Sequence, residues 1–197
     1  SGLVEGINYN TSDATKATLV IDAPGKDFIY VAGSFNNWQP GSNYAMKKDP
    51  TSGKFWLELT GLVSGVNNTY QYWVVDEIPI AGSPVLVKTA DPYSTLVLNK
   101  DEDPWIPSGN YPNLPAYPLG QEREVTVLQT GQATYNWSAS TTNFVKPTAD
   151  NLVVYEVLIR DFDANRSFQN LIDRIDYFKN LKINAIELMP VMEYEGN

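Results

Sequence analysis

Hydrophobic residues in the first half of the chain occur in short runs. Turn segments such as NNWQPGSN and DPTSGK separate the runs. In one run, Phe55, Leu57 and Leu59 alternate with Trp56 and Glu58, which is the pattern of a strand with one buried face. Short strands at this spacing predict a β-sandwich, so we expect a mainly β protein. The runs lie at 17–23, 27–33, 54–60, 69–76, 83–88 and 94–99.

The pattern changes beyond residue 150. LVVYEVLI (152–159) is a nearly continuous apolar run, as expected of a strand that is covered on both faces. Between 167 and 183 the apolar residues follow helical spacing, and Ser167 stands where a helix N-cap is expected. NAIELMPV (184–191) is a second apolar run. This order predicts a β-α-β unit with a right-handed crossover over residues 151–197.

The segment between these two parts is rich in proline. Five of the 13 prolines fall within residues 101–120, so this stretch cannot join a sheet ladder and should run extended over the surface. REVTVLQT (123–130) predicts one further strand. We therefore expect a sandwich over residues 1–100, a connector with one strand over 101–150, and the β-α-β unit over 151–197.

Composition excludes several classes of function. The net charge of −9, from 14 basic and 23 acidic residues, argues against a nucleic-acid partner. The absence of cysteine excludes disulfides and thiolate metal sites, and the absence of histidine removes the commonest general base. We expect no metal and no cofactor. No apolar stretch is long enough to span a membrane, and any signal peptide is expected to be absent or already removed.

Two parts of the chain resemble one family of enzymes. VVYEVLIRDF, the helix after it and NAIELMPVMEYEGN resemble the first strand, helix and second strand of the catalytic (β/α)8 barrel in α-amylase-family glycoside hydrolases. The segment from FIYVAGSFNNW to TYQYWVVD, with ADPYSTLV after it, resembles their immunoglobulin-like early-set sandwich. That sandwich is related to glycogen- and starch-binding modules. The resemblance covers most of residues 17–99 and 151–197, and implies an immunoglobulin-like sandwich followed by a truncated barrel segment.

The resemblance also implies a chemistry that this sequence lacks. Retaining enzymes of this kind use a carboxylate nucleophile and a carboxylic acid about 5–5.5 Å apart, which the family places on later barrel strands. We therefore expect the N-terminal portion of an α-glucan-acting hydrolase, without catalytic residues and inert alone. Asp161, Asp163, Glu193 and Glu195 are expected to be loop carboxylates, and Glu187 a buried residue paired within the barrel.

Sugar binding is the function that such a fragment can retain. In glycogen-binding relatives a tryptophan at the position of Trp38 stacks on glucose, so Trp38 is the first candidate for binding carbohydrate. Tyr72 falls where those relatives carry a sugar-contacting lysine and is the second candidate, although it departs from the pattern. Two alternatives stay open: an autonomous starch- or glycogen-binding module, and a purely structural sandwich that supports the barrel.

Three partners follow from this interpretation. They are an α-glucan oligo- or polysaccharide, the missing remainder of the barrel, and a second copy of the chain joined through exposed barrel strands. The twelve tyrosines and five tryptophans, together with the absence of cysteine, slightly favour a secreted or periplasmic enzyme.

Overall fold

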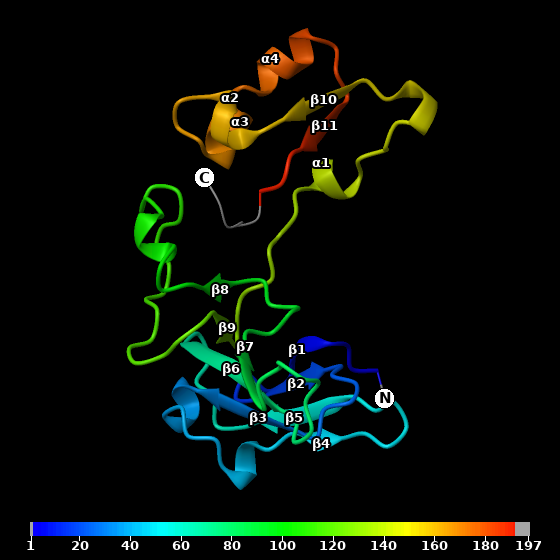
Figure 1. Cartoon of the computed structure of the whole chain (residues 1–197). Coiled ribbons are helices and arrows are strands. Elements are labelled where there is room, and N and C mark those ends of the chain that lie inside the picture. Colours follow the sequence, from blue (N-terminus) through cyan, green and yellow to red (C-terminus); the bar gives the residue numbers. More distant parts are fainter. Residues whose placement is uncertain (1, 192–197) are drawn as a thin grey trace. The chain divides into compact units, whose positions relative to one another are not determined.

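The structure is a computed structural model that describes residues 2–191. The chain divides into two compact units, unit 1 (Ser1–Thr134) and unit 2 (Tyr135–Asn197) (Figure 1). Within residues 2–191, no helix combines the length and the apolar character that a membrane span requires.

Unit 1 is built from two antiparallel sheets, which confirms the predicted sandwich-like fold. The first sheet has the order β1–β2–β5–β4. Its strands are β1 (Gly6–Tyr9), β2 (Ala17–Ile21), β4 (Lys47–Lys48) and β5 (Phe55–Leu59). The second sheet has the order β3–β6–β9–β8, and β7 also pairs with β6. Its strands are β3 (Phe28–Gly33), β6 (Asn67–Val75), β7 (Leu86–Thr89), β8 (Val97–Leu98) and β9 (Val125–Gln129).

The main core of unit 1 lies between the two sheets. Phe55, Leu57 and Leu59 of β5 are buried there, as their alternation predicted, whereas Glu58 is exposed. Large side chains from both sheets complete the cluster, because each strand turns every second residue inward. They include Leu19, Ile29, Val31, Tyr70, Tyr72 and Leu128.

A second, smaller core forms around β8 and β9. Val125 and Val127 alternate with Leu128, which belongs to the main core, so they face the other side of the second sheet. The proline-rich segment supplies the cover of this outer face, and the Gln71 amide of β6 donates to the backbone oxygens of Glu122 and Glu124 at 2.8 Å each. The cluster contains Leu98, Val125 and Val127, with Trp38, Leu96, Leu114 and Tyr117 packed against it.

Short 3-10 helices interrupt the loops of unit 1. They are η1 (Ser34–Asn36), η2 (Ser42–Tyr44) and η3 (Asp103–Trp105). The first of them opens the turn that carries Trp38, and the third lies in the proline-rich segment.

Unit 2 contains the predicted β-α-β unit. Its two strands are parallel, with Tyr155 in register with Ile186. The side chain of Ser167 accepts a hydrogen bond from the Asn170 backbone N–H at 3.2 Å, which confirms the predicted N-cap. The predicted helix over 167–183 is two helices, because Arg174 leaves helical geometry at φ −98° and ψ 12°. The elements are α1 (Ala139–Thr142), η4 (Ala149–Asn151), β10 (Val154–Val157), α2 (Ile159–Phe162), α3 (Phe168–Asp173), α4 (Ile175–Asn180) and β11 (Ala185–Leu188).

Candidate functional site

Trp38 stands in a tightly hydrogen-bonded turn directly after β3. The Asn36 side chain accepts from the Gly33 N–H at 2.8 Å and donates to the Val31 oxygen at 2.9 Å. The Trp38 N–H donates to the Gly33 oxygen at 2.9 Å. Asn37 and Trp38 both adopt left-handed backbone geometry, with φ of 53° and 58°. This geometry is uncommon for a residue as large as tryptophan and persists only where the surrounding structure holds it. Here the hydrogen bonds of Asn36 hold the turn in place.

Gly33 makes this turn possible for a steric reason. A Cβ atom at this position would lie 2.5 Å from the Thr69 backbone oxygen and 2.8 Å from the Phe35 ring. Because the oxygen belongs to the neighbouring strand, it cannot move aside without disturbing the ladder between β3 and β6. The GSFNNW sequence therefore encodes a close approach of two backbones followed by a left-handed turn.

The ring of Trp38 is only partly available to a ligand. It is partly buried against the outer core of the second sheet, in the same cluster as Leu114 and Tyr117. The structure thus places Trp38 near the surface of unit 1 but gives part of its ring a packing role.

Tyr72, the second predicted sugar contact, lies in the main core. Its side chain has 0% exposure, and its hydroxyl donates to the Asp91 carboxylate at 2.9 Å. Burial raises the pKa of the Tyr72 hydroxyl well above its ordinary value, with the nearby Asp91 charge as a second cause. A side chain without exposed surface cannot stack on a sugar, so the structure assigns Tyr72 to the core. It also separates the two candidates, because Trp38 packs on the opposite face of the second sheet.

Asp91 is the centre of a buried polar network that the sequence reasoning missed. The Tyr70 hydroxyl donates to the same carboxylate oxygen as Tyr72, at 2.7 Å. The other oxygen accepts the Tyr93 N–H at 2.8 Å, and the Asp91 N–H donates to the Thr126 hydroxyl at 2.7 Å. The signal was present in the sequence, since ADPYS places a charged residue between strands of a sandwich whose central strand carries alternating tyrosines.

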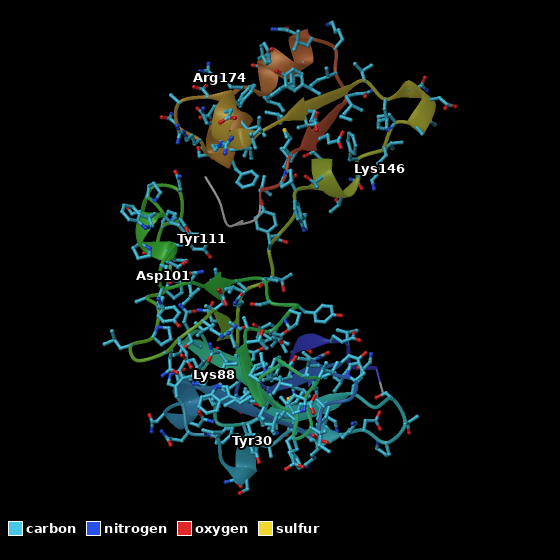
Figure 2. All side chains as sticks on the ribbon, viewed as in Figure 1. Tyr30, Lys88, Asp101, Tyr111, Lys146 and Arg174 are labelled. Carbon is cyan, nitrogen blue, oxygen red and sulfur yellow. The ribbon has the colours of Figure 1, made fainter. Side chains whose placement is uncertain are left out.

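The outer face of β6 is occupied as well. Lys88 of β7 (Figure 2) lies with its ammonium 4.4 Å from the centre of the Trp73 ring and pairs with Glu122 at 2.8 Å. Trp73 alternates with Tyr72 and faces the other side of the sheet, as predicted. The middle of β6 therefore has neither face free for a ligand.

Unit 2 has a pocket of its own at the carboxyl end of β10. The pocket has a volume of about 640 Å³ and includes Asp161, Asp163 and Arg174 among its lining residues. Hydrogen bonds from the Arg160 guanidinium lower the pKa of Asp161, and hydrogen bonds from Arg174 (Figure 2) lower that of Asp163. Both carboxyl groups are therefore held in the ionised form, whereas a glycosidase acid needs a raised pKa.

The expectation for Glu187 concerns a complete barrel, whereas the described residues contain only two of its strands. Its side chain is exposed, and the strand register places it beside Glu156 of β10. In the described part of the chain β10 and β11 alone form this sheet, so no closed barrel encloses the side chain. Glu193 and Glu195 lie outside the described residues. Among residues 2–191, no group of three or more acidic side chains is arranged to hold a metal ion.

Comparison with known proteins connects this fold to enzymes of α-glucan metabolism. The chain is 37% identical over 54 residues to malto-oligosyltrehalose trehalohydrolase of Saccharolobus solfataricus. It is 40% identical over 72 residues to a 1,4-alpha-glucan branching enzyme of Clostridium perfringens. The chain is related to a segment of α-amylase-family enzymes. These alignments cover 27% and 36% of the chain, and the chain spans only 10% of the length of each relative. No family model matches the chain.

Solved structures of the α-amylase family contain the same fold. A pullulanase of Klebsiella pneumoniae superposes with a TM-score of 0.65 at 15% identity, over 98% of this chain and 18% of that one. A pullulanase of Paenibacillus barengoltzii, solved as a complex with maltotriose, gives 0.61 at 17% identity, over 98% of this chain and 28% of that one. At these identities the likeness shows the fold alone.

Proposed function

We propose that this chain is the N-terminal portion of an α-glucan-acting glycoside hydrolase and is inert by itself. The observation that carries the proposal is the state of the carboxylates in unit 2. Asp161 and Asp163 line the pocket at the end of β10, yet arginine hydrogen bonds lower the pKa of both. A retaining mechanism needs one protonated carboxylic acid beside a nucleophile. The chain also has no histidine to serve as an alternative acid or base.

The relation to the α-amylase family supports the substrate class. One relative that shares sequence with this chain is named as a 1,4-alpha-glucan branching enzyme, and another is named as a malto-oligosyltrehalose trehalohydrolase. The chain spans only 10% of the length of these relatives. That it belongs to a longer enzyme, and that this enzyme acts on α-glucans, are therefore both parts of the proposal. The test is incubation of the chain with an end-blocked maltooligosaccharide. Cleavage of its glucosidic bonds, measured as new reducing ends, would overturn the proposal of an inert portion.

Binding of α-glucan at Trp38 is a second candidate function. It is favoured by the position of Trp38 in the GSFNNW turn and by the maltotriose complex of a structurally similar pullulanase. A single aromatic ring contributes only about 1 kcal/mol beyond burial, so the binding should be weak. The purely structural alternative is favoured by the packing of Trp38 against the outer core.

One titration separates these two candidates. Maltoheptaose or β-cyclodextrin is added while tryptophan fluorescence is recorded, first with the unaltered chain and then with Trp38→Ala. Trp137→Ala is the matched control, because Trp137 is 64% exposed and lies in unit 2. A response that Trp38→Ala alone abolishes supports binding at Trp38. A response that Trp38→Ala leaves intact contradicts binding at that residue.

A further inference from the structure

The proline-rich segment of unit 1 contains a second pocket, which neither the sequence reasoning nor the proposed function uses. The pocket has a volume of about 380 Å³, within the range of about 300–1,000 Å³ in which small-molecule sites fall. Every lining residue lies between 100 and 117, so one continuous stretch of chain forms it. Figure 2 labels Tyr111, one of the lining residues.

The walls of the pocket are fixed by the covalent and hydrogen-bonded structure of the loop. Prolines lock the backbone at several positions, including Pro104 and Pro115 in the lining. The N–H groups of Asn110 and Tyr111 both donate to the Pro107 oxygen, at 2.8 and 3.2 Å. Because the loop is already ordered, a ligand would not have to order it on binding.

A second set of hydrogen bonds anchors the base of the loop. The Asn99 side chain accepts from the N–H groups of Asp101 and Glu102 at 2.8 and 3.2 Å. The Asp103 carboxylate in turn accepts the Asn99 N–H at 3.0 Å. At the far end, the Tyr117 hydroxyl donates to the Arg123 backbone oxygen at 2.5 Å. The pocket is therefore held at both ends to the strands β8 and β9.

The polar groups of the pocket combine donors and acceptors. Asp103 provides carboxylate oxygens, and Lys100 provides an ammonium group that pairs with Asp101 at 2.7 Å. Ser108 and Asn113 line the pocket, and the described residues offer their side chains no hydrogen bond. The hydroxyl and amide groups are thus available to a ligand with hydroxyls of its own. Tyr111 adds an aromatic ring that is 42% exposed.

This chemistry favours a neutral polyol over an anion. An anion would meet Asp103 and the surrounding acidic side chains of a chain with a net charge of −9, while the charge of Lys100 is already neutralised by Asp101. A cation is distinguished from a sugar by titration with tetramethylammonium. A sugar presents hydroxyls to donors and acceptors together and an apolar face to an aromatic ring.

We propose that the pocket within residues 100–117 binds a glucosyl unit of an α-glucan, with the Tyr111 ring against one sugar face. The choice of glucose rests on the proposed function, whereas the neutral-sugar chemistry rests on the pocket. Trp38 does not line this pocket, although Leu114 and Tyr117 of the lining pack against the same outer core as Trp38.

Trp105 offers a reporter for this site. It lies between the lining residues Pro104 and Ile106, and its side chain is 81% exposed. The full chain is labelled with 5-fluorotryptophan, and the fluorine resonances of the five tryptophans are assigned with single Trp→Phe variants. Maltoheptaose is then titrated, and the resonances of Trp105 and Trp38 report on the two sites separately.

The expected result is a saturable shift of the Trp105 resonance. Tyr111→Ala should weaken the affinity about fivefold, as expected for loss of one aromatic contact, while Tyr111→Phe should leave it within about twofold. Tyr135→Ala is the matched control, because Tyr135 is 71% exposed and lies in unit 2. This substitution should leave the affinity measured at the Trp105 resonance unchanged. Circular dichroism confirms that each variant is folded.

Three results would overturn the proposal. They are an unmoved Trp105 resonance, an affinity that Tyr111→Ala does not change, and a response to tetramethylammonium in place of maltoheptaose. If the Trp105 resonance is unmoved while that of Trp38 shifts, the result supports binding at the GSFNNW turn instead. None of these results bears on hydrolysis, so the proposed function as an inert enzyme portion is judged independently.

Discussion

The substitution Tyr72→Phe tests whether this residue belongs to the core or to a sugar-binding surface. The change removes one hydroxyl, which donates to the Asp91 carboxylate at 2.9 Å inside a cluster with 0% exposure at Tyr72. A hydrogen bond to a buried charged group contributes about 1.5–3 kcal/mol to the free energy of unfolding. Because Tyr70 still donates to the same oxygen at 2.7 Å, we expect a loss near the lower end, about 1.5–2 kcal/mol.

The assay is urea unfolding followed by tryptophan fluorescence, with Tyr30→Phe as the control. Tyr30 (Figure 2) lies on β3 of the same sheet, and the described residues give its hydroxyl no hydrogen bond. Its substitution should change the free energy of unfolding by less than about 0.5 kcal/mol. In the double variant of Tyr70 and Tyr72, the loss should exceed the sum of the single losses, because one Asp91 oxygen then has no donor. An unchanged stability in Tyr72→Phe, with weakened binding of maltoheptaose, would refute the core assignment.

Three further predictions concern pH, the turn after β3 and self-association. Burial raises the pKa of Tyr70 and Tyr72 well above the usual value, so the unfolded chain loses these protons first as pH rises past about 10. The free energy of unfolding should therefore fall above that pH. In the double phenylalanine variant, the free energy of unfolding should fall less steeply with pH. Gly33→Ala should destabilise unit 1 by about 1–3 kcal/mol, because its Cβ would meet the Thr69 oxygen, and a stability within about 0.5 kcal/mol of the unaltered chain would contradict the close approach. Light scattering should detect dimers that form through the apolar residues exposed around β10 and β11. A variant with lysine at both Val154 and Leu188 should be monomeric. A monomeric unaltered chain at high concentration would contradict this prediction.

The period of the apolar residues was sufficient to predict most of the strands. Alternation in β5 predicted which of its side chains face the core, and two apolar runs around a helical segment predicted the parallel pair. The short strands β1 and β4 were not predicted, because two to four residues carry too little pattern to distinguish a strand from a loop. The break at Arg174 was also missed, since the apolar spacing continues through it.

The candidate site was less predictable than the fold. Alternation placed Tyr72 on the face opposite Trp73, but it does not tell which face of a central strand is buried when both are covered. The cover comes from residues 114–124, and nothing in the local pattern of a proline-rich stretch states which surface it lies on. Likewise, the exposure of Glu187 depends on the strands that pair beside β11, not on its own sequence.

The most direct test of the account is hydrolysis measured at high protein concentration. The chain is incubated with end-blocked maltoheptaose and with pullulan, which together offer α-1,4 and α-1,6 bonds, and released reducing ends are counted per protein molecule. We expect fewer than one bond cleaved per molecule, because arginine hydrogen bonds lower the pKa of both Asp161 and Asp163, whereas a general acid needs a raised pKa. Repeated turnover that Asp161→Asn or Asp163→Asn abolishes would contradict it.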